Sequence, residues 1–189
     1  MPGRHSYDLD ALITDIWRIL DAPGQTRAGL NEMGECLQRF ARYGGNLWEQ
    51  GHPRHTETGL DARLYYVDVL SGFRLLLLQF PPGEPTPVHS HLTWGVECVC
   101  DGMNRYTSWK RLDDGESPGH ARLELFADQT VGKGGLAFWF DPPGNIHRQV
   151  AEGTSPSTVL ALFGGDATRQ QIFDLETGTY TEAAAPDDG

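Results

Sequence analysis

Beyond residue 60, this 189-residue chain is a succession of short apolar segments separated by turn residues. A β-hairpin is predicted where residues 64–70 and 73–80 flank Ser71-Gly72, because two strand-length segments enclose a flexible turn. Further short strands are predicted at residues 106–111, 121–126, 136–140, 147–151, 158–163 and 171–175. Many short strands with regular turn punctuation favour a β-sandwich or barrel.

Two amphipathic helices are predicted ahead of the strands. Apolar residues recur at three- and four-residue spacing over residues 9–20 and again from residue 26 to about 43. Pro23-Gly24 and Gly44-Gly45 end these segments. No shift in composition marks a boundary, so we predict a single domain spanning residues 1–189. Its predicted parts are a helical portion at about 8–48, a β-barrel at about 60–176 and a mobile acidic tail at 181–189.

The composition argues against several classes of protein. A formal net charge of −11 and a pI of about 4.9 disfavour nucleic acid or an anionic membrane as a partner. The longest apolar run, residues 75–78, has the length of a buried strand and is far too short to span a membrane. Three cysteines without a signal peptide favour a cytoplasmic protein. Cys98 and Cys100 are predicted to be buried small hydrophobic residues.

Three of the seven histidines stand out by their spacing. His89 and His91 are two residues apart on a predicted strand, so their side chains share a face. His147 opens a later strand, directly after a Pro-Pro-Gly turn. Three facing imidazoles bind a divalent transition metal and leave coordination positions open for chemistry. The other four lie in polar, loop-like sequence and are predicted to be exposed and inert: His5, His52, His55 and His120.

These motifs resemble those of the cupin superfamily, Gly-x5-His-x-His-x3/4-Glu-x6-Gly and Gly-x5-Pro-x-Gly-x2-His. The matching residues are His89, His91 and Glu97 in the first motif, and Gly135, Pro142, Gly144 and His147 in the second. One extra residue precedes Glu97, and another lies between Gly135 and Pro142. The resemblance implies a double-stranded β-helix. The predicted fold class is therefore a β-dominated cupin jelly-roll barrel with short N-terminal helices.

Within the superfamily, the chain resembles the thiol dioxygenases, namely cysteine dioxygenase and 3-mercaptopropionate dioxygenase. The shared features are the helices, the hairpin, Pro-Val-His-x-His and Gly-Asn-Ile-His in the same order, over roughly residues 10 to 175. The segment Trp94-Gly95-Val96 is similar to the bacterial mercaptopropionate enzymes. The resemblance implies Fe(II) bound by His89, His91 and His147. It also implies a non-haem iron dioxygenase, a monomer or homodimer, that adds O2 to a small carboxylate-bearing thiol to give a sulfinate.

The residues expected around the substrate depart from this family. Its Ser-x-His-x-Tyr triad falls at Val159, Ala161 and Phe163, so no hydroxyl or imidazole is left there. The family's Cys–Tyr crosslink is also impossible, because Val96 and Phe163 occupy its two positions. The aromatic residues expected to line the pocket are Trp94, Trp139 and Phe163. This predicts a more apolar pocket and a bulkier or more specialised thiol.

Two arginines are candidates for binding a substrate carboxylate. Arg63 lies at the spacing before the first histidine where cysteine dioxygenase places its carboxylate-binding arginine, and a guanidinium suits a carboxylate. Its alternative role is that of a surface arginine at a strand end. Arg169 lies near the position of the carboxylate arginine in the mercaptopropionate enzymes, and its alternative is a surface salt bridge.

Glu97 separates the functional alternatives. In a regular strand it faces the same way as His91 and is predicted to be a fourth ligand or a catalytic base, whereas a β-bulge would turn it outward. A carboxylate ligand would weaken the attraction of the metal for a thiolate. It would favour a cupin oxygenase that acts on a non-sulfur substrate. A third alternative is a cupin that binds a ligand without catalysis.

Overall fold

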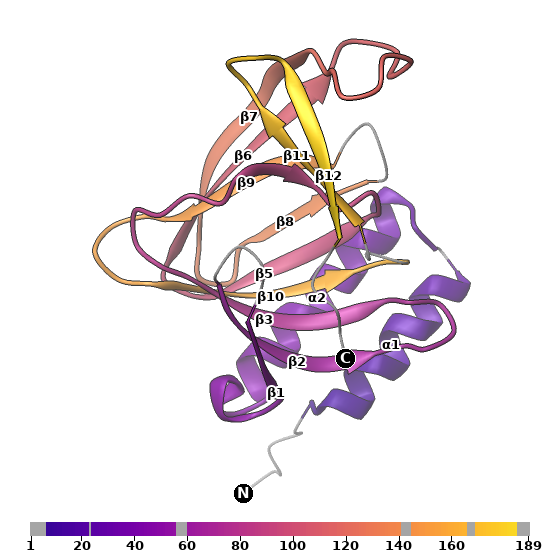
Figure 1. The fold of residues 1–189 in the computed structure, drawn as a ribbon. Coiled ribbons are helices and arrows are strands. Elements are labelled where there is room, and N and C mark those ends of the chain that lie inside the picture. Colours follow the sequence, from indigo (N-terminus) through magenta and orange to yellow (C-terminus); the bar gives the residue numbers. More distant parts are fainter. Residues whose placement is uncertain (1–6, 23, 56–59, 141–144, 166–168, 185–189) are drawn as a thin grey trace, which may run out of the picture.

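The computed structural model describes residues 7–22, 24–55, 60–140, 145–165 and 169–184. Two helices, α1 (Leu9–Asp21) and α2 (Arg27–Tyr43), precede a short 3-10 helix, η1 (Leu47–Glu49). The strands in the described residues are β1 (His52–His55), β2 (Asp61–Val67), β3 (Arg74–Phe80), β4 (Val88–Ser90), β5 (Gly95–Asp101), β6 (Met103–Arg111), β7 (Leu123–Gly132), β8 (Leu136–Trp139), β9 (Ile146–Ala151), β10 (Ser157–Phe163), β11 (Arg169–Asp174) and β12 (Thr179–Ala184). Figure 1 shows the strands in two layers, with both helices outside one layer.

The strands described here form two six-stranded antiparallel sheets. The first sheet has the order β1-β2-β3-β10-β5-β8, and the second has the order β12-β11-β4-β9-β6-β7. Neighbouring strands come from distant parts of the chain, since β10 pairs with both β3 and β5, and β4 pairs with β9 and β11. This jelly-roll arrangement confirms the predicted fold class, a β-dominated double-stranded β-helix with N-terminal helices.

Both helices begin at a residue whose side chain caps the first turn. The Asp8 carboxylate accepts a hydrogen bond from the backbone nitrogen of Ala11, and the Thr26 hydroxyl accepts one from that of Gly29. Such caps satisfy backbone N–H groups that lack a partner within the helix. The observed helices start and end within a residue or two of the predicted segments. In the described part of the chain, no helix is long and apolar enough to cross a membrane.

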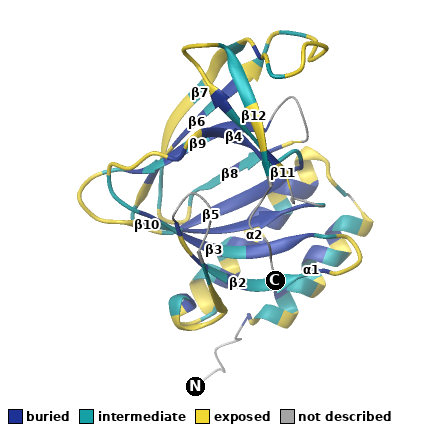
Figure 2. Ribbon diagram, viewed as in Figure 1, coloured by how far each residue is buried: buried dark blue, intermediate teal, exposed yellow. Residues whose placement is uncertain are grey.

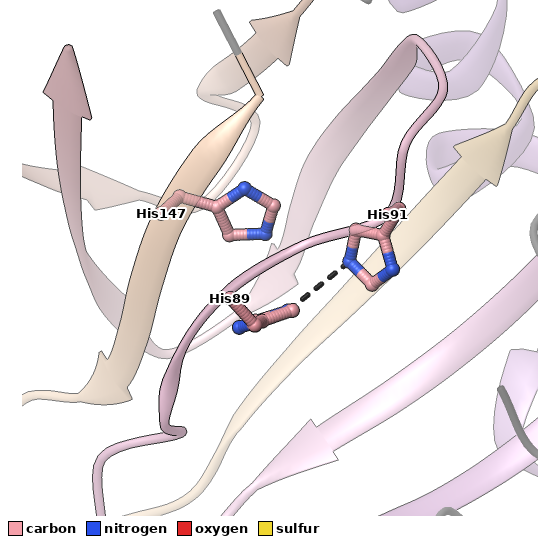
Figure 3. Close-up of side chains that lie close together, drawn as sticks. All are labelled: His89, His91 and His147. Carbon is pink, nitrogen blue, oxygen red and sulfur yellow. Dashed lines mark hydrogen bonds between the residues drawn. The ribbon is translucent and has the colours of Figure 1, made fainter. Parts of the chain in front are cut away.

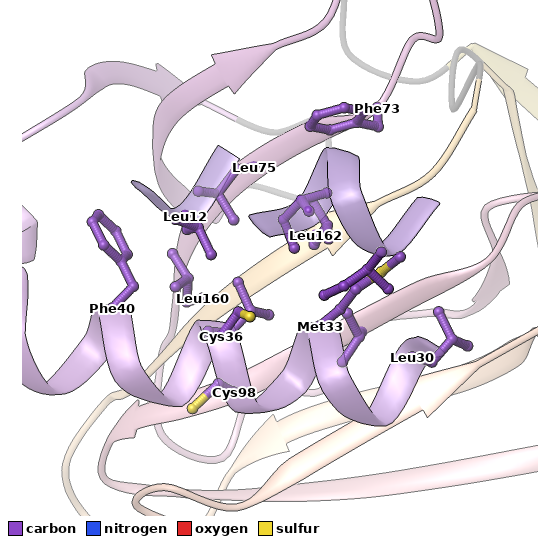
Figure 4. Close-up of a cluster of buried hydrophobic side chains, with 14 of the residues drawn as sticks. Leu12, Leu30, Met33, Cys36, Phe40, Phe73, Leu75, Cys98, Leu160 and Leu162 are labelled. Atoms are coloured by element: carbon purple, nitrogen blue, oxygen red, sulfur yellow. The ribbon is translucent and has the colours of Figure 1, made fainter. Parts of the chain in front are cut away.

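The apolar faces of the helices pack on the outer face of the first sheet. Leu75 on β3 and Leu160 and Leu162 on β10 are fully buried against α1 and α2 (Figure 4). Alternation along a strand turns successive side chains to opposite faces, so this helix-facing core takes every second residue of β3, β5 and β10. The other face of these strands is thereby left to point between the two sheets.

The space between the sheets forms a separate apolar interior. Leu78 on β3 and Val159, Ala161 and Phe163 on β10 belong to it, together with Tyr106 from β6 of the second sheet. The three residues at the family's triad positions therefore face the interior. Figure 2 shows burial concentrated on the central strands, whereas β7, at the edge of the second sheet, is largely exposed.

The predicted tail differs from the structure. Strand β12 pairs with β11 in register from Asp174 opposite Thr179 to Arg169 opposite Ala184. The turn between them is stabilised by the Asp174 carboxylate, which accepts hydrogen bonds from the backbone nitrogens of Glu176 and Thr177. Residues 181–184 are therefore part of a β-hairpin, not a mobile tail, and residues 185–189 lie outside the described residues. Strand β1 was also not predicted from the sequence.

Replacing Leu75 with alanine tests the helix-facing core. The Leu75 side chain is fully buried between the helices and the first sheet. Its truncation should lower the free energy of unfolding by about 2–5 kcal/mol, because both the transfer energy and a residual cavity contribute. Val69→Ala is the matched control, since Val69 is 91% exposed and its truncation should change stability by less than about 0.5 kcal/mol. Equal denaturation midpoints for the two variants would contradict this assignment of the core.

Candidate metal centre

The three predicted histidines come together inside the barrel. His89 lies on β4 directly opposite His147 on β9, and His91 follows two residues after His89. Their nitrogen donor atoms all lie within 4.8 Å of one another (Figure 3). Among the described residues, this is the one group of three or more ligand-type side chains close enough to hold a single ion. The predicted metal ligands are thus assembled from two strands of the second sheet and the loop after β4.

Hydrogen bonds fix which nitrogen of two imidazoles faces the centre of the group. Nδ1 of His89 donates to the carbonyl oxygen of Pro87 at 2.9 Å, and Nδ1 of His147 donates to that of Asn145 at 3.1 Å. In a neutral imidazole the other nitrogen is then an unprotonated acceptor. Backbone carbonyls commonly orient metal-binding histidines in this way. The Nε2 atoms of His89 and His147 therefore carry free lone pairs.

The unprotonated Nε2 atoms of His89 and His147 are suited to bind a cation. Nε2 of His147 is buried and has no hydrogen-bond partner among the described residues. Nε2 of His89 lies 3.1 Å from Nε2 of His91, as Figure 3 marks with a dashed line. Burial lowers the pKa of all three histidines, and for His147 and His91 it does so well below 6.5. Neutral imidazoles are the form that binds metal ions, so these residues fit a divalent transition metal.

A strained backbone position directly follows His91. Leu92, immediately after His91, has φ of 57°, and it is the one non-glycine residue with positive φ among those described. This left-handed conformation costs of order 1 kcal/mol or more for a side chain such as leucine. It lies between the end of β4 at Ser90 in the second sheet and the start of β5 at Gly95 in the first. Such strain is retained where a site requires a particular geometry.

Aromatic rings pack against two of the three histidines, His91 and His147. Phe163 on β10 lies with its ring centroid 4.7 Å from that of His91, and Trp139 on β8 lies 4.8 Å from that of His147. Tyr106 on β6 stacks on His147 at 5.2 Å with an interplanar angle of 23°. Trp139 and Phe163, which the sequence predicts to line the pocket, therefore adjoin the metal centre. Tyr106 was missed, although its strand was predicted.

A glycine permits the close approach of Trp139. The Trp139 ring lies against Gly95 on the neighbouring strand, where an added Cβ would come within 2.1 Å of Cζ2 of that ring. No side chain other than hydrogen fits there without displacing the indole. Gly95 thus belongs to the architecture of the metal centre, although its φ is unremarkable for any residue.

Trp94 and Arg63 lie away from the histidines. Trp94 belongs to the helix-facing core, and its ring covers Gly164. Arg63 is paired across strands with Leu77, another residue of that core, and cross-strand partners share a face. The Arg63 guanidinium donates to the carbonyl oxygen of Trp48 at 3.1 Å and lies 4.8 Å from the Trp48 ring centroid. This placement corrects the expectation that Arg63 and Trp94 contact a substrate at the metal, because both sit on the opposite face of the first sheet.

Arg169 is an exposed residue at the start of β11. Its guanidinium lies 3.9 Å from the Glu182 carboxylate on β12, which corresponds to the surface salt bridge considered from the sequence. Arg74 occupies a different environment, since it is 8% exposed and lies opposite Phe163 across β3 and β10. Sequence reasoning missed Arg74. Arg74, Leu76 and Leu78 are two residues apart on β3, so their side chains share the interior face. This spacing could have placed Arg74 in the interior from the sequence alone.

Glu97 points into the interior but does not belong to the metal-binding group. It lies on β5 opposite Ala161 and Ala137, both interior residues, within a regular part of the strand. Its carboxylate accepts a hydrogen bond at 3.0 Å from Nε2 of Gln149, whose Oε1 accepts one at 2.6 Å from Asn104. Burial raises the pKa of Glu97, and the hydrogen bond from Gln149 lowers it by a smaller amount, so that the pKa is about 8. Glu97 is therefore a predominantly neutral buried acid at pH 7.

Comparison with known proteins relates the chain to cupin structures at low similarity. No family model matches the sequence, and no curated protein matches it. An RmlC-like cupin protein from Ralstonia eutropha JMP134 is 14% identical with a TM-score of 0.45, covering 66% of each chain. A cupin 2 conserved barrel domain protein from Salinispora arenicola CNS-205 is 18% identical with a TM-score of 0.42, covering 59% of this chain and 80% of that one.

An oxalate oxidase in complex with the substrate analogue glycolate is 18% identical with a TM-score of 0.46. The match covers 62% of this chain and 57% of the oxalate oxidase chain. The chain thus spans less than two thirds of the length of the oxalate oxidase and of the Ralstonia protein.

Removing one ligand tests the metal centre directly. After loading with a divalent transition metal, His147→Ala should retain only a small fraction of the ion that the wild type holds, because two imidazoles cannot complete a set of three. His120→Ala is the matched control, since His120 is exposed and lies outside the group. Metal content after equilibration and desalting, measured by elemental analysis, checks the prediction. Equal metal content in the two variants would exclude His147 as a ligand.

The buried Glu97 should leave a signature in stability against pH. Its pKa rises from 4.5 in the unfolded chain to about 8 in the folded one. The folded state therefore holds a proton that the unfolded state releases above pH 4.5. Without metal, wild-type stability relative to Glu97→Gln should fall by about 1.4 kcal/mol per pH unit between pH 4.5 and 8. The stabilising effect is complete below pH 4.5 and lost as the pH rises through 8.

The lowered pKa values of the three histidines make stability rise with pH, which is the opposite trend. Because the histidines are present in both proteins, this contribution cancels when the stability of Glu97→Gln is subtracted from that of the wild type. Urea denaturation of the two proteins at pH 5, 6, 7 and 8 provides the measurement. Parallel stability curves would contradict the raised pKa of Glu97.

Proposed function

We propose that this protein is an Fe(II)-dependent dioxygenase similar to the thiol dioxygenases. It would add both atoms of O2 to the sulfur of a small thiol, so that RSH and O2 give the sulfinic acid RSO2H. The thiol sulfur is oxidised and O2 is reduced, without a further reductant. The partners are the thiol and O2, with Fe(II) as the cofactor.

The observation that carries this proposal is the protonation pattern of the three histidines. His89 and His147 keep their protons on Nδ1, held by backbone carbonyls, which leaves their Nε2 atoms unprotonated. The Nε2 of His89 lies 3.1 Å from that of His91, and ligand atoms of all three residues lie within 4.8 Å of one another. Three neutral ligands leave a divalent ion its full charge, which favours an anionic thiolate as an additional ligand. Iron, when bound there, supplies the redox chemistry of the oxygenation. The absence of Glu97 from the ligand group supports a thiol over a substrate that needs a carboxylate ligand.

The surrounding residues exclude water from the reacting groups. Phe163, Trp139 and Tyr106 present rings to His91 and His147, and Trp139 is 2% exposed. A dry, low-dielectric site strengthens the attraction between a cation and a thiolate. Ala161 and Phe163 lack the imidazole and the phenolic hydroxyl that the family carries at these positions, and Val159 is apolar where the family has a serine. These differences support a substrate more apolar than cysteine.

Proton handling would fall to groups other than the family's triad. Tyr106 lies against His147, and burial together with the nearby Glu97 charge raises the pKa of Tyr106 well above 10. The phenol therefore stays protonated and can donate a hydrogen bond to an oxygen atom on the product. Glu97, held by Gln149, is mostly protonated at pH 7, so it can donate a proton in the interior but cannot accept the one that the thiol loses.

Oxygen consumption by the Fe(II)-loaded protein tests this function. A panel of thiols should include 3-mercaptopropionate, cysteine and bulkier aliphatic thiols, and at least one should yield a sulfinate by mass spectrometry. His147→Ala should reduce the rate at least 100-fold, whereas His120→Ala should not change it. Uptake with diketones or aminophenols but with no thiol would replace the proposal with a cupin oxygenase for non-sulfur substrates. Binding of thiols without oxygen uptake would favour a non-catalytic cupin.

A further inference from the structure

Trp139 places an indole N–H group inside the barrel, against the histidines. Its ring lies over Gly95 of the neighbouring strand, where Cε2, the ring atom bonded to Nε1, comes within 2.5 Å of the position that a Cβ would take. Gly95 shares the interior face of β5 with Val99, because alternate residues of a strand face the same way. The Trp139 ring centroid lies 4.8 Å from that of His147 and 5.9 Å from that of His91. The indole N–H is therefore part of the lining of the candidate metal centre.

Two buried polar atoms of opposite character lie on these adjoining rings. Nε1 of Trp139 is a hydrogen-bond donor only, and it has no partner among the described residues although the side chain is 2% exposed. Nε2 of His147 is an acceptor, and it too is buried without a partner in the described chain. Buried polar atoms without partners are unfavourable. A bound species that satisfies both presents a positive charge to His147 and an electron pair to Trp139. A metal ion together with a ligand oxygen meets both requirements.

Trp94 shows what is particular to Trp139. Its Nε1 is likewise buried without a partner in the part of the chain described, and its ring also covers a glycine, Gly164. Trp94, however, belongs to the helix-facing core, whereas the ring of Trp139 contacts two of the predicted metal ligands. A molecule bound at the histidines can accept a hydrogen bond from Trp139 but not from Trp94. The two tryptophans are thus a test residue and its matched control.

We propose that the indole N–H of Trp139 donates a hydrogen bond to an oxygen atom of the sulfinate, the group that the reaction forms on the thiol sulfur. This inference rests on the proposed function and makes Trp139 a catalytic residue. The thiol carries no oxygen on its sulfur and the sulfinate carries two, and sulfur is the weaker acceptor. The hydrogen bond therefore strengthens as oxygen reaches sulfur, and an interaction that strengthens along a reaction lowers its barrier. Tyr106 on the second sheet and Trp139 on the first both pack against His147, so each sheet supplies one donor.

NMR spectroscopy of the Zn²⁺-loaded protein tests the hydrogen bond without turnover. The chain has five tryptophans, and the indole N–H signal that disappears in Trp139→Phe is that of Trp139. Propane-1-sulfinate should move this signal downfield, whereas propane-1-thiol, with the same carbon chain and no oxygen, should not. The Trp94 signal should stay in place with both compounds. If Trp139→Phe does not fold, through-space contacts with the His147 ring identify the signal in the wild type.

Calorimetric titration of the same Zn²⁺-loaded protein measures the effect on affinity. Trp139→Phe should weaken the binding of propane-1-sulfinate about 10-fold, because it removes one hydrogen bond to a charged group, and should change that of propane-1-thiol less than about twofold. Trp94→Phe should change neither affinity. An unmoved Trp139 signal on sulfinate binding would overturn the proposal. So would equal losses of sulfinate and thiol affinity in Trp139→Phe, which would indicate a structural role alone.

Oxygen uptake by the Fe(II)-loaded protein separates this inference from the proposed function. A Trp139 signal that moves with sulfinate, in a protein that oxidises no thiol, supports the hydrogen bond and contradicts the thiol dioxygenase. Sulfinate formation from a thiol, with a Trp139 signal that does not respond to sulfinate, supports the thiol dioxygenase and contradicts the role of Trp139.

Discussion

The direct pairing of His89 with His147 across β4 and β9 is the constraint on which the candidate site depends. Strand β4 has three residues, so its register is held mainly by its neighbours β9 and β11 and by Thr86. The backbone nitrogen of Thr86 donates to the carbonyl oxygen of Gln149, and the Thr86 hydroxyl accepts from the backbone nitrogen of Gln149. A slip of one residue would turn His89 to the other face of the sheet. The positions of two of the three histidines are thereby fixed by backbone pairing, whereas His91 lies in the loop after β4, directly before the left-handed Leu92.

The interior between the sheets contains buried ionisable groups, which a purely apolar core lacks. Three imidazoles, a carboxyl group and a guanidinium lie among aromatic and aliphatic side chains, where unpaired charge is expensive. The protein keeps the imidazoles neutral by burial and keeps Glu97 mostly protonated beside Gln149. The orphaned Nε2 of His147 is then the kind of unsatisfied buried atom that a bound ion resolves. Stability and metal binding are coupled through the same groups.

Much of the fold and of the metal-binding group could be predicted from the sequence. The helix stripes and the hairpin turn are local patterns, and both were read correctly from their period. The His-x-His spacing pointed to residues that do come together, but His91 lies in the loop after β4 and not on the predicted strand. The residues around the substrate could not be predicted as well, because they depend on which face of the first sheet points inward. Arg63 and Leu64 are consecutive residues on β2, so their side chains point to opposite faces of the sheet. The Arg63 side chain lies on the face of Trp48 and the helices. A register shift between Leu64 and Tyr66 adds to the difficulty, because alternation cannot be followed through it.

The replacement of a tyrosine by Phe163 has a consequence for how the site would work. In the resembling enzymes the hydroxyl stands on β10, whereas here the phenol nearest to a ligand stands on β6, stacked on His147. Glu97 lies on β5 of the first sheet, and Gln149 from β9 of the second sheet donates a hydrogen bond to its carboxyl group. The protonated phenol beside the histidines therefore stands on the sheet that carries His89 and His147, whereas in the resembling enzymes it stands across the interior on the first sheet.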